Sequence, residues 1–128
     1  MSPEDRLRPH PELRLAEPVK VVDLEAAVRM LRAEAHAAVA GHRQITMFRN
    51  GPVTLVVFVF ATAGHLNEHK AEGVVTIQVL AGQLAVDVGG QTHELGAGQL
   101  VALGPGVPHT VRALSPSEML LTVHKTER

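Results

Sequence analysis

The sequence predicts an all-β domain preceded by a single α-helix, and three observations support that prediction. Apolar residues recur at helical spacing over residues 23–40. From residue 44 onward the apolar positions alternate with a period of two instead. Turn residues divide this second region, to about residue 124, into short apolar segments. Such a pattern is typical of an antiparallel sandwich or a small barrel. A chain of 128 residues fits one domain, which we place at 21–128.

The region before the barrel is expected to hold an arm and the helix. Residues 1–20 contain several prolines and no apolar periodicity, so we expect a loose or extended arm. A strand lent to a partner subunit is the alternative. Asp23 suits the N-cap of a helix over 23–40, and Gly41 suits its C-terminal stop. The apolar stripe of this helix consists of Leu24, Val28, Leu31, Ala35 and Val39.

Turn signals and apolar alternation predict roughly eight short strands after Gly41. Asn50-Gly51 and Gly89-Gly90 are typical of tight hairpin turns. Segment 53–61 is almost entirely apolar, which predicts a strand covered on both faces. The expected strands are 44–49, 53–61, 74–81, 84–88, 91–95, 100–103, 110–114 and 118–125.

Composition argues against several classes of function. The net charge is −1 and no basic block stands out, which argues against a nucleic-acid partner. The only aromatic rings apart from histidine belong to three phenylalanines, so base stacking is improbable too. The absence of cysteine removes disulfides and thiolate chemistry. No apolar run is long enough to span a membrane, and we expect a cytoplasmic protein.

Two segments carry a resemblance to a known family. "GAGQLVALGPGVPHTVRA" and "GHLNEHKAEGVVTIQVLAG" resemble the two sequence motifs of the cupins. The segment "GAGQLVALGPGVPHTVRA" corresponds to the second cupin motif. Gly98, Gly106 and His109 occupy the glycine and histidine positions of that motif. Its usual proline and asparagine are replaced by Gly104 and Ala113. The resemblance covers about residues 44–124 and implies a jelly-roll barrel, often a homodimer, with a ligand pocket inside.

The other segment departs further from the motif of metal-binding cupins. Counting back from Gly82, the family's glutamate falls on Val75 and its second histidine on Ala71, whereas the first histidine is His69. Of the usual metal ligands, therefore, only His69 and His109 are retained. Under simple strand alternation His69, Ala71, Val75, Ile77 and Val79 share one mainly apolar face.

The leading interpretation is a cupin that binds a small organic molecule inside its barrel. We expect His69 and His109 to be polar anchors on a wall that includes Val75, Ile77 and Val79. The alternative is a metal-dependent enzyme of the dioxygenase, isomerase or decarboxylase type. His69 and His109 would then hold Fe, Mn, Ni or Zn with a non-standard third ligand. The candidates for that third ligand are His65, Glu72, His93 and His124.

Three further expectations concern the remaining groups. Asp87 should lie on the solvent face of its strand, where it cannot orient either histidine as a catalytic base. His10 and His42 are expected in loops. A homodimer would use the helix 23–40 and the long apolar strand 53–61.

Overall fold

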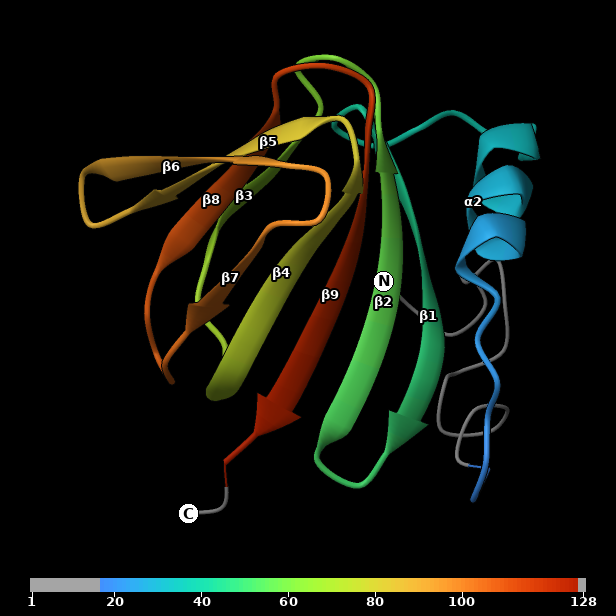
Figure 1. Cartoon of the computed structure of the whole chain (residues 1–128), viewed down its shortest axis with the longest axis horizontal. Helices are drawn as coiled ribbons and strands as arrows, with labels where there is room; N and C mark the ends of the chain where they lie inside the picture. Colours follow the sequence, from blue (N-terminus) through green and yellow to red (C-terminus); the bar gives the residue numbers. More distant parts are fainter. Residues whose placement is uncertain (1–16, 127–128) are drawn as a thin grey trace.

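The computed structural model describes residues 17–126 and shows one helix followed by an antiparallel two-sheet barrel (Figure 1). The expected all-β fold with a preceding helix is confirmed. Most of the predicted arm over 1–20 lies outside the described residues. The elements are α2 (Leu24–Ala33), β1 (His42–Asn50), β2 (Val53–Phe60), β3 (His65–His69), β4 (Gly73–Ala81), β5 (Gln83–Val88), β6 (Gln91–Gly96), β7 (Leu100–Leu103), β8 (His109–Ala113) and β9 (Ser117–Lys125).

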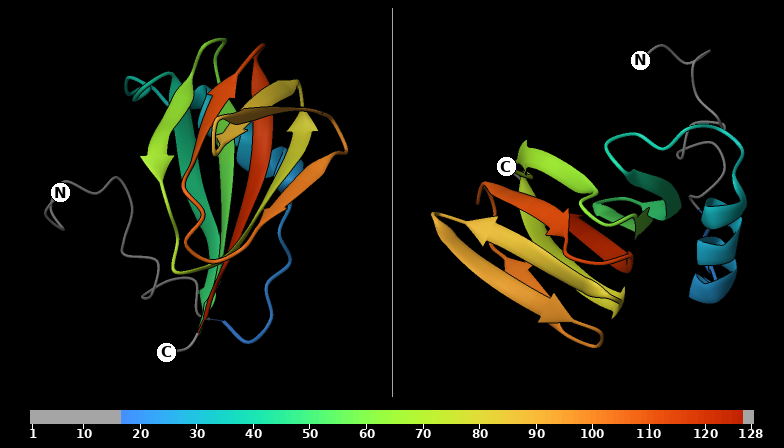
Figure 2. Two further views of the ribbon diagram at one scale, coloured as in Figure 1. Left: turned by 90° about the vertical axis from the view of Figure 1, so that its left-hand side faces the viewer. Right: turned by 90° about the horizontal axis from the view of Figure 1, so that it is seen from above.

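The strands form two sheets that face each other. The five-stranded sheet has the order β1-β2-β9-β4-β7, and the four-stranded sheet has the order β3-β8-β5-β6. Chain neighbours such as β2 and β3 therefore lie in different sheets, as in a jelly roll. In the left view of Figure 2 the four-stranded sheet lies in front of the five-stranded sheet. The right view shows α2 next to the end of the five-stranded sheet that holds β1 and β2. We call the faces that meet between the sheets the inner faces.

Strand β2 is covered on both faces, as its composition predicts. On its inner face Val56, Phe58 and Phe60 join the main core between the sheets. On its outer face Val57 and Val59 pack against α2 in a second cluster. Both sets are at most 7% exposed, which explains why an almost wholly apolar strand is stable here.

The helix is shorter than predicted. Its N-cap is Asp23, as expected, and the side chain accepts a hydrogen bond from the Ala26 amide at 3.0 Å. The helix ends at Ala33 rather than near residue 40, because the following Glu34 is extended. Leu31 is fully buried against β2, whereas Val39 is 73% exposed. Without apolar contacts beyond Leu31, the end of the stripe gains too little from packing to extend the helix.

The expected single strand face over residues 69–79 is divided between the two sheets. β3 belongs to the four-stranded sheet and β4 to the five-stranded sheet, so residues 70–72 cross between the two sheets. Gly73 begins β4 where the backbone of β9 comes very close. A Cβ at Gly73 would overlap the carbonyl oxygen of His124, so this crossing requires glycine. Val75, Ile77 and Val79 face inward on β4, and Ala71 in the crossing segment also packs against the main core.

Candidate functional site

His109 is the best-defined polar group on the inner faces. It begins β8 and is 2% exposed. Its Nδ1 lies 3.1 Å from the Val107 carbonyl oxygen, which can only accept, so Nδ1 carries the proton in the neutral ring. Nε2 is then the acceptor nitrogen of that ring. This arrangement fixes the tautomer and the orientation of the imidazole, as is required of a group that anchors a ligand.

The loop before His109 is tied to the crossing segment at residues 70–72. The Gly106 amide donates to the Ala71 carbonyl at 2.9 Å, with Gly106 in the left-handed region at φ +75°. The turn in the "PGVPH" segment therefore connects the segments of the two motifs physically. Backbone pairing brings them together again, because position 69 at the end of β3 is the register partner of His109. A register shift between Leu66 and His69 precedes this pair.

The predicted apolar wall lies on the inner face of the five-stranded sheet. Val75, Ile77 and Val79 are at most 2% exposed and belong to the main core. Their cross-strand neighbours on β9 include Leu121 and Met119, which belong to the same core. Any ligand in the barrel would therefore meet a wall of branched aliphatic side chains. The binding roles of these residues, and of His69 and His109, stay predictions.

The four candidates for a third metal ligand are spread over the molecule. His65 is exposed on β3 and pairs with Arg112, away from the core. His124 is exposed near the end of β9 and pairs with Val74 on the outer face. Glu72 is exposed in the crossing segment. His93 is different: it is half-buried and pairs with Val86, a core residue, which places it on the inner face of β6.

The described side chains do not fit a three-ligand metal centre. Within the part of the chain whose side chains are described, no group of three His, Cys, Asp or Glu residues is close enough to hold an ion. His93 lies on β6, which is two strands from β8, a separation of about 10 Å between the strands. Across the sheet, the residue of β8 in register with His93 is Val111 and not His109. Zinc sites use three or four protein ligands, and non-haem iron sites use three. We therefore derive no chemical step through a metal.

An open hollow of about 430 Å³ adjoins the His109 end of the barrel. It is formed where the crossing segment, the loop before His109 and the end of β9 meet, at the lower end of the barrel in Figure 1. Its lining is mixed, with one cation, one carboxylate and small groups. The lining residues are Lys70, Ala71, Glu72, Pro105, Gly106 and Thr126.

Asp87 lies on the outer face of the four-stranded sheet, as expected. Its carboxylate accepts hydrogen bonds from Thr92 at 2.5 Å, Thr110 at 3.2 Å and Arg112 at 3.3 Å. The hydrogen bond from Thr92 is the largest cause that holds the pKa of Asp87 below its ordinary value of 3.8, and Arg112 and Thr110 act in the same direction. Because Asp87 faces away from the core, it cannot orient His109 as a base.

His42 is not in a loop, and the expectation that it would be is wrong. It begins β1 and is paired with Phe60. Its ring centroid lies 5.7 Å from that of Phe58 and 5.8 Å from that of Phe60. A sequence signal was available: His42 continues the alternation of Gln44 and Thr46 by one more step towards the N-terminus.

With this geometry in view, comparison with known proteins gives the family. The chain belongs to the cupin domain family, whose model matches residues 56–124. The resemblance drawn from the two motifs is thus confirmed, as is the jelly-roll fold that it implied. No curated protein sequence matches the chain. Within the described residues, no helix is both long enough and apolar enough to cross a membrane.

Solved structures support the same fold. A conserved protein of unknown function from Streptococcus pyogenes is similar, with a TM-score of 0.69 and 23% identity over 88% of this chain and 92% of that one. A cupin superfamily protein from Desulfitobacterium hafniense DCB-2 has a TM-score of 0.66 and 15% identity over 94% of each chain. The Cupin_2 domain of an XRE family transcriptional regulator from Enterobacter cloacae has a TM-score of 0.61 and 19% identity, covering 68% of this chain and 99% of that one.

Proposed function

We propose that this cupin binds a small organic molecule at the His109 end of its barrel. The observation that carries the proposal is the buried imidazole of His109, fixed by the Val107 carbonyl and placed beside core aliphatic side chains. Position 69, its register partner, supplies the second anchor. A pocket with few polar groups on an apolar wall binds organic molecules rather than bare cations.

The hollow beside the loop at residues 104–107 gives this proposal a route of entry. Lys70 and Glu72 line it together with the Gly106 backbone. A ligand with a polar end and an apolar body would place the polar end towards these groups and His109. The physiological role would be to sense, store or buffer such a metabolite.

A thermal-shift screen with a metabolite panel, run on wild type and matched histidine variants, tests this function. A ligand at a hundred times its Kd adds about 2.7 kcal/mol to the free energy of unfolding, which is readily detected. We expect at least one compound to raise the Tm of wild type and of His65→Ala, but not of His109→Ala. His65 is the control because it is exposed on the opposite face of the same sheet. A shift that persists in His109→Ala would contradict the proposed site.

A metal-dependent enzyme remains the second candidate, and His93 is the observation that favours it. Of the four proposed third ligands, it alone has a register that places it on the inner face. Elemental analysis of untagged protein tests this candidate. Near-stoichiometric Fe, Mn, Ni or Zn, lost in the His69→Ala plus His109→Ala variant and reduced in His93→Ala, would support the enzyme. Metal-free, folded wild type would exclude it.

We also infer a homodimer, for which the exposed apolar side chains are the support. The expected interface used β2 and the helix, but α2 already covers the outer face of β2 within the same chain. The outer face of β4 and β7 carries Val74 and Leu100, which are 39% and 52% exposed. Light scattering at several concentrations should give twice the monomer mass, and Leu100→Glu should shift it to the monomer. A monomeric wild type would refute the inference.

A further inference from the structure

A second cavity, of about 540 Å³, lies at the end of the barrel opposite His109. It opens between the segment that follows α2 and the end of β2, at the upper end of the barrel in Figure 1. Its size falls within the range of about 300–1,000 Å³ that small-molecule sites occupy. Its lining includes the polar groups Arg32, His42 and Arg43 and the apolar groups Val59, Phe60 and Pro116.

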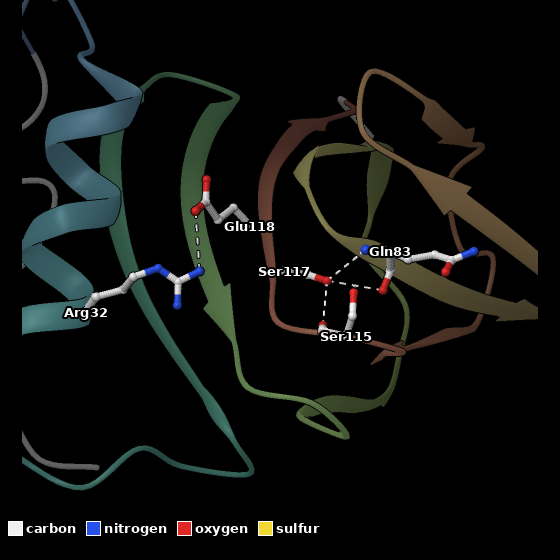
Figure 3. Close-up of polar contacts among 5 residues, drawn as sticks. All are labelled: Arg32, Gln83, Ser115, Ser117 and Glu118. Carbon is white, nitrogen blue, oxygen red and sulfur yellow. Dashed lines mark hydrogen bonds and ion pairs between the residues drawn. The ribbon is translucent and has the colours of Figure 1, made fainter.

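The polar side of this cavity is rich in positive donors. Arg43 donates from Nη1 to the His36 carbonyl at 2.5 Å, which holds the guanidinium in place but uses only part of its donor set. Arg32 pairs with Glu118 on β9 at 3.3 Å, as Figure 3 shows. Glu118 is not among the lining residues, so two cations and no carboxylate line the cavity. Because Glu118 already balances Arg32, the charge of Arg43 is the one that favours an anionic ligand here.

His42 lines the cavity from the inner face of the sheet, where it is the register partner of Phe60. Its Nδ1 is buried and has no hydrogen-bond partner within the described structure. A proton on Nδ1 would be an unsatisfied buried donor, so the neutral ring carries its proton on Nε2. The ring itself is held by Phe58 and Phe60.

The rim of the cavity is pre-formed by two interlocked turns. Gly41 is at φ +72°, and a Cβ there would meet the Gly64 Cα at 2.7 Å, so the two glycine backbones are in direct contact. The Ala61 amide donates to the Gly41 carbonyl at 2.9 Å, which fixes the end of β2 beside His42. Ala40 and Ala63 occupy the left-handed region at φ 51° and 65°. Such backbone strain in non-glycine residues is concentrated at functional sites.

We propose that this cavity is a second binding site, for a small organic carboxylate with a short apolar body. The carboxylate is bound by the guanidinium groups of Arg43 and Arg32, which both lie on the outer face of the sheet: Arg43 is the register partner of Val59, and Arg32 reaches Glu118 in the same row. The apolar body packs against Val59, Phe60 and Pro116. An ionised acceptor is required, because hydrogen bonds to a charged group are about twice as strong as neutral ones.

The first test is a titration with sodium benzoate, followed by amide chemical shifts in a ¹H–¹⁵N spectrum. We expect saturable shifts at Gly41, His42, Ala61 and Thr62. Benzamide, which has the same shape without the charge, should bind about tenfold more weakly or worse. Equal binding of benzoate and benzamide would overturn the proposal, as would shifts confined to the His109 end.

Matched arginine variants locate the charge. Arg43→Gln should weaken benzoate at least about tenfold, whereas Arg49→Gln, on the same strand but outside the cavity, should leave it unchanged. If both substitutions weakened benzoate binding equally, the binding would depend only on the overall charge of the protein, and the site would be refuted. If Arg43→Gln does not fold, Arg43→Lys keeps the charge but loses the planar donor pair, and it should bind at intermediate strength. Arg43→Lys binding as wild type does would also refute the geometry.

The result does not depend on the proposed function at the other end of the barrel. The same titration in His109→Ala should give unchanged benzoate binding, because that residue lies at the opposite end. Loss of benzoate binding in His109→Ala would mean that the probe enters the barrel instead, and the second site would be rejected.

Discussion

Truncation of Ile77 measures whether the middle of the barrel is filled by side chains. Ile77 is fully buried between Leu121 on β9 and Val101 on β7. Ile77→Ala removes Cγ1, Cγ2 and Cδ1, which at about 0.8 kcal/mol per carbon loses about 2.4 kcal/mol of transfer free energy. A residual void of about 70 Å³ adds about 1.7 kcal/mol. The expected loss in unfolding free energy is therefore about 4 kcal/mol.

Urea unfolding followed by circular dichroism provides the assay. Ile77→Val should cost about 1 kcal/mol, and Val74→Ala, on the exposed face of the same strand, should cost less than Ile77→Ala by a wide margin. A loss below about 1 kcal/mol for Ile77→Ala would refute the packed interior. It would mean that the barrel is hollow at this depth and that the ligand site extends to the middle of β4.

Three further predictions follow from single contacts. Gly73→Ala should lower the unfolding free energy by about 1–3 kcal/mol, because the added Cβ overlaps the His124 carbonyl oxygen. Gly104→Ala is the control, since a Cβ there has no neighbouring atom and should change the stability little. Equal losses in urea unfolding of the two variants would contradict the close approach at Gly73. Because the folded pKa of Asp87 is lowered, its contribution to stability is present above the ordinary value of 3.8 and is lost as pH falls through the folded pKa. Asp87→Asn should therefore be less stable than wild type near pH 6, with the difference shrinking below pH 3.8 in acid unfolding; a constant difference would contradict this. Ser117→Ala should cost about 1–3 kcal/mol, because the buried hydroxyl accepts from the Gln83 amide at 3.0 Å and donates to a nearby carbonyl (Figure 3); an unchanged Tm would show that the network is not stabilising.

Local sequence signals predicted much of the site. His109 was predicted to lie inside the barrel, and the structure has it buried directly after a turn with Gly106 in the left-handed region. The alternation of Val75, Ile77 and Val79 predicted a shared face, which the core confirms. These predictions hold because each depends on strand geometry or turn chemistry within a few residues.

Side-chain positions that depend on contacts between different strands were not predicted from the sequence. His93 could not be placed on the inner face from its own strand, because that face is decided by its pairing with Val86. His42 was assigned to a loop because its packing partners, Phe58 and Phe60, lie on another strand. In both cases the missing information was a contact between segments that are separated in the chain.

The sequence by itself determined the all-β class, eight of the nine strands that the structure describes, the N-cap at Asp23 and the cupin motifs, since these depend on periodicity and local backbone preference. Strand β3 was not expected. Only the tertiary structure decided where the helix ends and which sheet each strand joins. The helix ends at Ala33 because the sheet covers the stripe only as far as Leu31. Residues 70–72 cross between sheets because β3 pairs with β8 in one sheet and β4 pairs with β9 in the other. Both outcomes depend on long-range burial and pairing, which no local pattern encodes.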